Sequence, residues 1–408
     1  MTAKTNELFS KYQARRTKKE KTSFIQYICS LAASAGYLSS VDKSKSHARN
    51  IIIGDLAESE IVYTAYYDTS SASLLPSFVT PSIPVLTTLY QVLIALVNLA
   101  AGALGFAVPY LLLSLAPIPA SITMLISIIL AFAAFVGTMI LTVSGRSRDN
   151  SANSNTSGVA TIVELMSNMP EEYRNRTAFV LFDLHDIGCV GSAEFAKRHK
   201  KHLKKKLIVN LDSVGVGDEI VVSLHKHAKS KKYRPIIEAA FDNKNGFEVC
   251  AGGVSIPSDH KKFKTSICVS AFKRSKLGFL YLANLNSNND TECSGNNIEI
   301  IRDALLKLAE FVIDPRALEE ANTLPAVEKA PEEAVQTDVQ QTDEAEETAT
   351  EAEAEAADEE ATTEAEAEVA EEEVVSAVEA EETATETEAE AEQTDADEAP
   401  EVNEENKE

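Results

Sequence analysis

The sequence is poor in cysteine, with five among its 408 residues, an odd number and never in a close pair. This spacing excludes a disulfide framework and a zinc ribbon, because both need closely or regularly paired cysteines. We therefore expect reduced, buried thiols. The chain also has no apolar stretch behind a short charged start, so no signal peptide is expected. The cysteines are Cys29, Cys189, Cys250, Cys268 and Cys293.

Charged residues are missing from one long segment. No Asp, Glu, Lys or Arg occurs between Asp68 and Arg146. Within it, residues 85–107 and 122–143 are each long enough to cross about 30 Å of hydrocarbon at about 1.5 Å per residue. Two adjacent helices without a polar face would find too little protein surface to bury them in a soluble core. The sequence therefore predicts a transmembrane helical hairpin over residues 81–143.

The turn between these two spans, residues 116–119, contains two prolines, which end a helix because proline lacks an N–H donor and clashes with the preceding turn. A hairpin returns the chain to the side that it left. Its tip has no charge, whereas Arg146, Arg148 and the basic N-terminal region flank it. The positive-inside rule then predicts an integral protein of the cell membrane, with its soluble domain and its tail in the cytoplasm. The alternative is an extracytoplasmic domain, which would be an exception to the positive-inside rule.

Aromatic residues are absent after Pro315, and basic residues are almost absent. From residue 317 onward there are 36 acidic residues against Lys329 and Lys407, so this segment carries −34. Subtraction from the totals of 63 acidic and 38 basic residues leaves 27 and 36, or +9, for the rest of the chain. A segment made mainly of Glu, Ala, Thr and Gln cannot bury enough apolar surface to offset its ordering entropy. We predict a disordered acidic tail over residues 316–408.

The N-terminal residues 1–36 are predicted to be mainly helical and basic, with the helix over residues 7–37. A basic run at residues 15–21 leads into a more apolar second half. Two interpretations stay open. The basic half is the solvated face of an ordinary domain helix, or it contacts anionic lipid headgroups.

Strand and helix patterns alternate on either side of the apolar segment. This alternation predicts an α/β domain over residues 37–80 and 144–315, with a mixed, mostly parallel sheet covered by helices on both faces. The hairpin is then an insertion within one domain. Strands are expected at residues 49–53, 60–67, 177–184, 206–214, 219–224, 247–251 and 277–283, and helices at residues 158–169, 192–203, 234–241 and 298–313.

The run of lysines at residues 200–206 is the strongest basic cluster in the predicted domain. It lies at the end of a predicted helix and has no interleaved aromatic residues, which favours a solvated face. We expect no nucleic-acid partner.

Six short motifs follow one another in an order that resembles one family, the di-zinc aminopeptidases of peptidase clan MH, related to glutamate carboxypeptidase and the transferrin receptor. Each motif is weak alone, and their order and spacing carry the resemblance, which covers roughly residues 50–312 apart from the hairpin. The motifs are AYYDT (65–69), NSNTSGV (153–159), FDLHDIG with GS (182–188 and 191–192), NLD (210–212), SDH with a following Phe (258–260 and 263) and NSNNDT (286–291).

The resemblance implies two zinc ions at the loop edge of a doubly covered sheet. In the family, a His of the first motif and the Asp of the fourth hold one zinc, and a Glu of the third and a His of the last hold the other. An Asp of the second motif bridges both ions, and a second Glu of the third motif is the general base. The chemistry requires these residue types, since paired cations need an anionic bridge and the metal-bound water needs a base.

This chain departs from that pattern at most of the implied positions. A neutral serine cannot bridge two dications, and an asparagine amide is a poor zinc ligand compared with imidazole. Each zinc would keep one protein ligand where three are usual, so we expect neither tight zinc binding nor metal-assisted hydrolysis, and no cofactor. Tyr66, Ser154 and Asn286 stand at the first, bridging and last ligand positions, His185 at the base, Asp186 at the ligand Glu, and Asp212 is unchanged.

The sequence therefore predicts a membrane-bound, aminopeptidase-like pseudo-enzyme that acts as a binding or scaffolding module. Its expected partners are the lipid bilayer and a peptide or protein ligand in the former active-site cleft. The alternative is an active membrane-anchored metallo-aminopeptidase with a rearranged zinc site made from His185, Asp186, Asp212 and either Asp259 or His260. A third hypothesis makes the hairpin and the tail the functional parts, with the tail competing with anionic lipid for the basic body.

Overall fold

The computed structural model describes residues 2–69, 78–144 and 149–323, so nearly all of the acidic tail that we predicted to be disordered lies outside the described residues. In the described part, one nine-stranded mixed sheet runs in the order β1-β2-β4-β3-β5-β8-β6-β7, with β9 paired to β8. The strands are β1 (Ser39–Lys43), β2 (Arg49–Ile53), β3 (Ile61–Tyr66), β4 (Thr177–Phe182), β5 (Leu207–Leu211), β6 (Glu219–Lys226), β7 (Phe247–Cys250), β8 (Thr265–Arg274) and β9 (Leu280–Tyr281).

The four central strands, β4, β3, β5 and β8, are parallel to one another. Each is buried along almost its whole length, as expected where helices cover both faces of a sheet. Alternate residues of β3 belong to different cores: Tyr63 and Ala65 pack with the larger cluster, and Val62 and Tyr66 with a smaller one on the opposite face. The predicted α/β fold class is confirmed.

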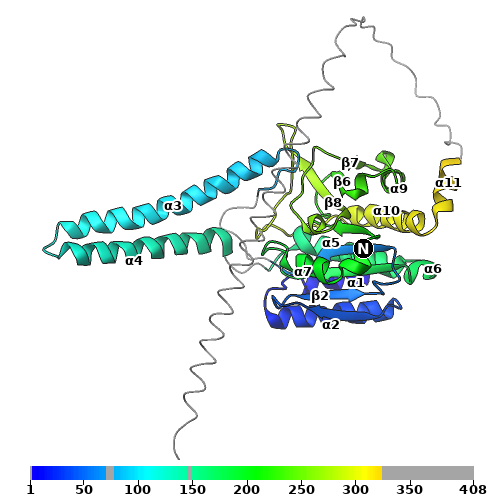
Figure 1. Ribbon diagram of the computed structural model, residues 1–408, viewed down its shortest axis with the longest axis horizontal. Helices are drawn as coiled ribbons and strands as arrows, with labels where there is room; N and C mark the ends of the chain where they lie inside the picture. Colours follow the sequence, from blue (N-terminus) through cyan, green and yellow to red (C-terminus); the bar gives the residue numbers. More distant parts are fainter. Residues whose placement is uncertain (1, 70–77, 145–148, 324–408) are drawn as a thin grey trace, which may run out of the picture. The chain divides into compact units, whose positions relative to one another are not determined.

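Helices fill the space around this sheet (Figure 1). Side chains of α1, α2, α5, α9 and α10 contribute to the larger core, and Phe195 of α7 contributes to the smaller one on the other face. The helices are α1 (Ala3–Lys11), α2 (Lys18–Ser34), α3 (Pro84–Ser114), α4 (Ala120–Met139), α5 (Ser157–Asn168), α6 (Glu171–Arg174), α7 (Val190–Arg198), α8 (Lys200–Leu203), α9 (Arg234–Ala240), α10 (Gly295–Ile313) and α11 (Pro315–Thr323).

The two apolar helices are present between β3 and α5, where the charge-free segment predicted them. Figure 1 shows α3 and α4 side by side, and both are long and apolar enough to cross a membrane. Their large apolar side chains are mostly exposed, and Asn98 is the buried residue of α3. The Asn98 amide donates to the Thr142 hydroxyl at 3.2 Å, on the turn of π-helix that continues α4.

The N-terminal region differs from the prediction, because two helices replace the single one expected over residues 7–37. Thr17 and Glu20 form a capping box that starts α2, so the chain breaks before it. Arg15, expected in the basic run, is fully buried and donates to the Thr156 hydroxyl at 2.9 Å. The run is therefore not a uniform solvated or lipid-facing surface.

Three further predictions were wrong in detail. The sequence reading missed β8, because Ser266, Cys268 and Ser270 interrupt its apolar residues although all three are buried in the sheet. It also placed a strand over residues 277–283, where β9 has only two residues. The tail was expected to be unstructured from residue 316, but α11 continues to Thr323 because Leu318 packs on the core.

Candidate functional site

The candidate site lies at the carboxyl ends of β3, β4 and β5, where ligands of open α/β sheets commonly bind. Tyr66 is the last residue of β3, and its hydroxyl donates to the carbonyl oxygen of Ser154 at 2.8 Å. Its ring stacks on the imidazole of His185, with centroids 3.7 Å apart and planes 10° from parallel. The Tyr66 side chain thus connects the end of β3 with the π-helical turn before α5 and with the loop after β4, at the position where the family has a zinc-binding imidazole.

Ser154 lies in the buried turn of π-helix, Ala152–Thr156, that precedes α5. Its hydroxyl donates to a carboxylate oxygen of Asp290 at 2.6 Å, and its backbone N–H donates to the same oxygen at 3.1 Å. The other oxygen of Asp290 accepts from the Asn153 N–H at 2.6 Å. The position of the family's bridging carboxylate is therefore occupied by a hydroxyl that is directed to a structural acceptor.

His185 follows β4 in a loop, because the strand ends at Phe182 and not at the expected residue 184. Leu184 adopts a left-handed φ of 56°, which turns the chain so that His185 and Asp186 both reach the pocket. The His185 N–H donates to both carboxylate oxygens of Asp68 at 3.1 Å. Adjacent side chains of a strand point to opposite faces, whereas in this loop His185 and Asp186 both line the pocket.

The imidazole of His185 is held by a carboxylate. Its Nδ1 lies 2.7 Å from Oδ2 of Asp259, whose other oxygen accepts from the Ser192 hydroxyl at 2.5 Å. Burial lowers the pKa of His185, but the Asp259 carboxylate outweighs it and holds that pKa well above its usual value. Burial raises the pKa of Asp259, but His185 outweighs it and holds that pKa below its usual value. The two groups form a buried ion pair.

Asp212 and Asp68 are two further carboxyl groups at this site. Asp212 follows β5 and accepts from the Ser213 hydroxyl at 2.9 Å, and burial raises its pKa. Burial and then the nearby Asp186 carboxylate raise the pKa of Asp68. Both shifts favour the protonated acids.

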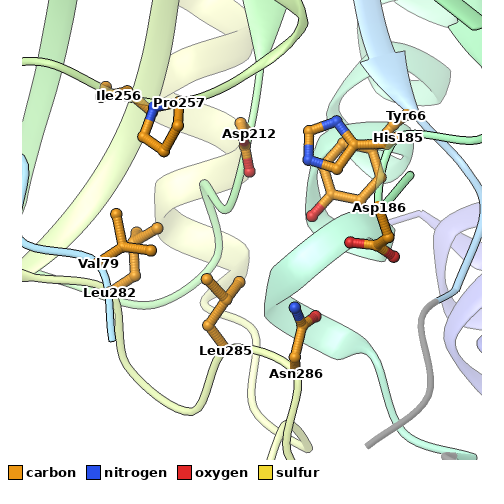
Figure 2. A pocket seen from close by; sticks show the side chains of 10 residues that line it. All are labelled: Tyr66, Val79, His185, Asp186, Asp212, Ile256, Pro257, Leu282, Leu285 and Asn286. Carbon is orange, nitrogen blue, oxygen red and sulfur yellow. The ribbon is translucent and has the colours of Figure 1, made fainter. Parts of the chain in front are cut away.

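These side chains surround a pocket of about 50 Å³ (Figure 2). That is room for a few water molecules or one small chemical group. Figure 2 shows the His185 ring over Tyr66, with Asp212 across the pocket from it. Of the six positions singled out from the motifs, the structure brings five to this lining, and Ser154 lies beneath Tyr66. The lining is Tyr66, Val79, His185, Asp186, Asp212, Ile256, Pro257, Leu282, Leu285 and Asn286.

The family's pair of zinc ions does not fit this arrangement. In the part of the chain that the structure describes, one group of three or more side chains has its potential ligand atoms within 4.8 Å of one another: His185, Cys189 and Asp259. Neither Asp186 nor Asp212, the two acidic residues that stand at ligand positions of the family, belongs to this group. Of the residues that the alternative hypothesis assigns to a rearranged site, only His185 and Asp259 belong to this group.

Sequence reasoning missed Cys189, which we interpreted as one of five reduced, buried thiols. Its Sγ lies 3.7 Å from Nδ1 of His185, and burial raises its pKa. The signal that could have found it is local: a cysteine four residues after the histidine that stands at the family's base position, in a short loop before a helix.

Comparison with known proteins supports the resemblance over part of the chain. The sequence model of Peptidase family M28 matches residues 139–281, from the end of α4 to β9. A search of curated proteins finds no match. Residues 139–281 are therefore similar in sequence to Peptidase family M28.

Solved structures with similar folds include zinc peptidases and glutaminyl cyclases. The glutaminyl cyclase of Porphyromonas gingivalis is 14% identical, with 78% of this chain and 94% of that one covered and a TM-score of 0.46. A Zn-dependent exopeptidase from Parabacteroides distasonis is 14% identical, covers 75% and 95%, and has a TM-score of 0.46. A zinc aminopeptidase from Bacillus subtilis is 16% identical, covers 64% and 49%, and has a TM-score of 0.38.

Proposed function

We propose that this chain is a membrane-attached, M28-peptidase-like binding module that does not hydrolyse its ligand through a pair of zinc ions. The observation that carries the proposal is the interior of the site. The Tyr66 hydroxyl and the Ser154 hydroxyl are both committed to hydrogen bonds, to the Ser154 carbonyl oxygen and to Asp290 respectively. Two dications in that space would face no bridging anion and no imidazole other than His185, which already pairs with Asp259.

The pocket is suited to holding one small group of a larger ligand. Its walls combine apolar side chains such as Leu282 and Leu285 with the polar ends of Asp212, His185 and Asn286. A mostly apolar pocket with a few directed polar groups is the usual form of a binding site. At about 50 Å³ it takes only a terminal group or a short side chain, which supports a peptide or protein ligand over a large cofactor.

Attachment to a bilayer through α3 and α4 is the second part of the proposal. α3 exposes mainly leucine and valine side chains, and α4 exposes leucine, isoleucine and phenylalanine side chains, all of which water solvates poorly. The flanking arginines and the basic N-terminal region support a cytoplasmic position for the domain and the tail by the positive-inside rule.

The catalytic part is tested by metal analysis of the full chain, purified without chelator in detergent, together with hydrolysis assays on aminoacyl amides. We expect fewer than two zinc ions per chain and no hydrolysis. A matched variant that restores the family's residues, Tyr66→His, Ser154→Asp, His185→Glu, Asp186→Glu and Asn286→His, is expected to bind more zinc than the parent. Two zinc ions in the parent, or hydrolysis that a chelator abolishes, would overturn the proposal.

Membrane insertion is tested by tryptophan fluorescence, since the chain contains no tryptophan. Leu104→Trp places one on the exposed face of α3, and Leu38→Trp places one at another exposed position, before β1. In vesicles of brominated phosphatidylcholine we expect strong quenching at position 104 and little at position 38. Equal quenching at the two positions would remove membrane attachment through the hairpin.

A second candidate function is favoured by one observation, the approach of His185, Cys189 and Asp259. It is the active membrane-anchored metallo-aminopeptidase, with a rearranged site. This candidate requires chelator-sensitive hydrolysis that His185→Ala or Asp259→Ala abolishes. Variants that behave like the parent would eliminate it.

A further inference from the structure

A cluster of three possible metal ligands lies beside the pocket, outside the family's ligand positions. Nδ1 of His185, Sγ of Cys189 and a carboxylate oxygen of Asp259 all lie within 4.8 Å of one another. We infer that these three side chains form a site for a single zinc-type divalent ion. The inference goes beyond the proposed loss of the paired zinc ions, because none of the three residues stands where the family has a zinc ligand.

The donor set indicates which metal the site would take. One thiolate, one imidazole and one carboxylate are all ligands of structural and catalytic zinc, whereas magnesium and calcium prefer oxygen alone. A thiolate and a carboxylate together carry −2, which neutralises a divalent ion inside the protein. The Cys189 sulfur makes cobalt a suitable probe and disfavours magnesium.

The distances can be compared with a tetrahedral ion. Zinc bonds of about 2.3 Å to sulfur and about 2.0–2.1 Å to nitrogen place those two ligand atoms about 3.6 Å apart at the tetrahedral angle. The structure has 3.7 Å between Sγ of Cys189 and Nδ1 of His185. A nitrogen and an oxygen on the same ion would be about 3.3 Å apart. The observed 2.7 Å is a hydrogen bond, so the carboxylate of Asp259 must move by about half an ångström.

The surroundings hold the three ligands in place. The Ser192 hydroxyl orients Asp259, which is the kind of outer contact that fixes a metal-binding carboxylate. Cys189 adopts a left-handed φ of 60° directly before α7, an uncommon backbone state for a residue other than glycine. Its N–H donates to the carbonyl oxygen of His185 at 2.8 Å, so a tight backbone turn brings the thiol back to the imidazole.

Three protein ligands leave one position of a tetrahedral ion open. His185 also lines the pocket, so a water molecule or a donor group of a bound ligand is the expected fourth partner. The site would then connect metal binding to the proposed binding of a ligand, without requiring that the ligand be cleaved.

The test uses the full chain in detergent, stripped with chelator and titrated with Co²⁺ and then with Zn²⁺ as competitor. We expect one equivalent of Co²⁺ with the near-ultraviolet charge-transfer absorption of a thiolate ligand, displaced by Zn²⁺. Cys189→Ser is expected to lose this absorption and to weaken binding at least tenfold. Cys250→Ser, which removes a partly exposed thiol elsewhere in the domain, is the matched control and should bind like the parent.

Each outcome separates the inference from the proposed function. Absence of the thiolate absorption in the parent, or its persistence in Cys189→Ser, would overturn the single-ion site and leave the proposed function standing. Two zinc ions that Cys189→Ser retains would overturn both. Circular dichroism and thermal unfolding of Cys189→Ser establish that the variant is folded, and Asp259→Asn provides a second route to the same loss of affinity.

Discussion

Two apolar helices of this protein, α5 and α3, have opposite surroundings. Ten of the twelve residues of α5 are buried against the sheet and α10. In α3, which has 31 residues, Asn98 alone is buried, and leucines and valines are exposed along its length. One helix directs its apolar side chains into protein and the other directs them outward. The difference teaches that apolar composition alone does not decide whether a helix is buried in the protein. Burial also requires enough neighbouring protein surface to cover the apolar side chains.

The largest effect expected from this comparison comes from placing one lysine on each helix. Val163→Lys puts a charge into the core beneath α5, and the desolvation cost of several kcal/mol should prevent the domain from folding. Leu104→Lys, at an exposed position of α3, should leave the domain folded and disfavour insertion by about 2.5–3.5 kcal/mol. Yield, membrane fraction and circular dichroism measure both. Equal loss of the folded domain in the two variants would contradict the claim that α5 is packed in the domain core and α3 is not.

Substitution of one glycine in α5 and one in α4 makes the same comparison with a smaller expected effect. A Cβ on Gly158 in α5 would lie 2.8 Å from the carbonyl oxygen of Leu211, whereas a Cβ on Gly137 in α4 meets nothing within 4 Å. We expect Gly158→Ala to cost about 1–3 kcal/mol of unfolding free energy through overpacking. Gly137→Ala should be neutral, or stabilise α4 by up to about 1 kcal/mol. Thermal unfolding in detergent compares them, and a stable Gly158→Ala variant would contradict the close packing of α5.

We expect low pH to destabilise the α/β domain and not the α3–α4 hairpin. Burial, then the nearby His225 and Lys261, lowers the pKa of His260 from 6.5 to about 3. Because the folded pKa lies below the unfolded one, the unfolded chain binds the proton first, so this stability is present above pH 6.5 and is lost as the pH falls toward 3. His260→Gln should reduce the slope of stability against pH over this range, measured with chelator present.

Exposed His202→Gln is the control for that measurement and should keep the parental slope. An unchanged slope in His260→Gln would contradict the neutral, buried state of this histidine.

The smallest effect is expected inside the hairpin, at the hydrogen bonds between Asn98 and Thr142. Polar pairs between helices in lipid contribute on average about 0.6 kcal/mol, because the separated helices find other partners. Asn98→Ala should therefore lower hairpin stability only slightly, with no change in the thermal unfolding of the domain. A loss of several kcal/mol would show that α3 depends on this contact much as α5 depends on its core.

Much of the framework was predictable from local pattern. Strands such as β3 and β4 are continuous apolar runs, and the charge-free segment gave both hairpin helices. The misses have specific causes. Strand β8 carries buried serines that only the completed sheet makes acceptable, and the break before α2 depends on a cap formed by two side chains. Arg15 is buried because Thr156, far away in sequence, accepts its hydrogen bond.

The sequence alone determined part of the candidate site, since motif order singled out six positions and five of them, Tyr66, His185, Asp186, Asp212 and Asn286, line one pocket. The structure alone decided what these side chains do. The pairing of His185 with Asp259 and the approach of Cys189 depend on a turn and on chain segments some 70 residues apart, and hydrogen bonds of 2.5–3 Å follow only from folded geometry. Composition and spacing fix residue types along a chain, whereas ligation and ion pairing depend on distances in space.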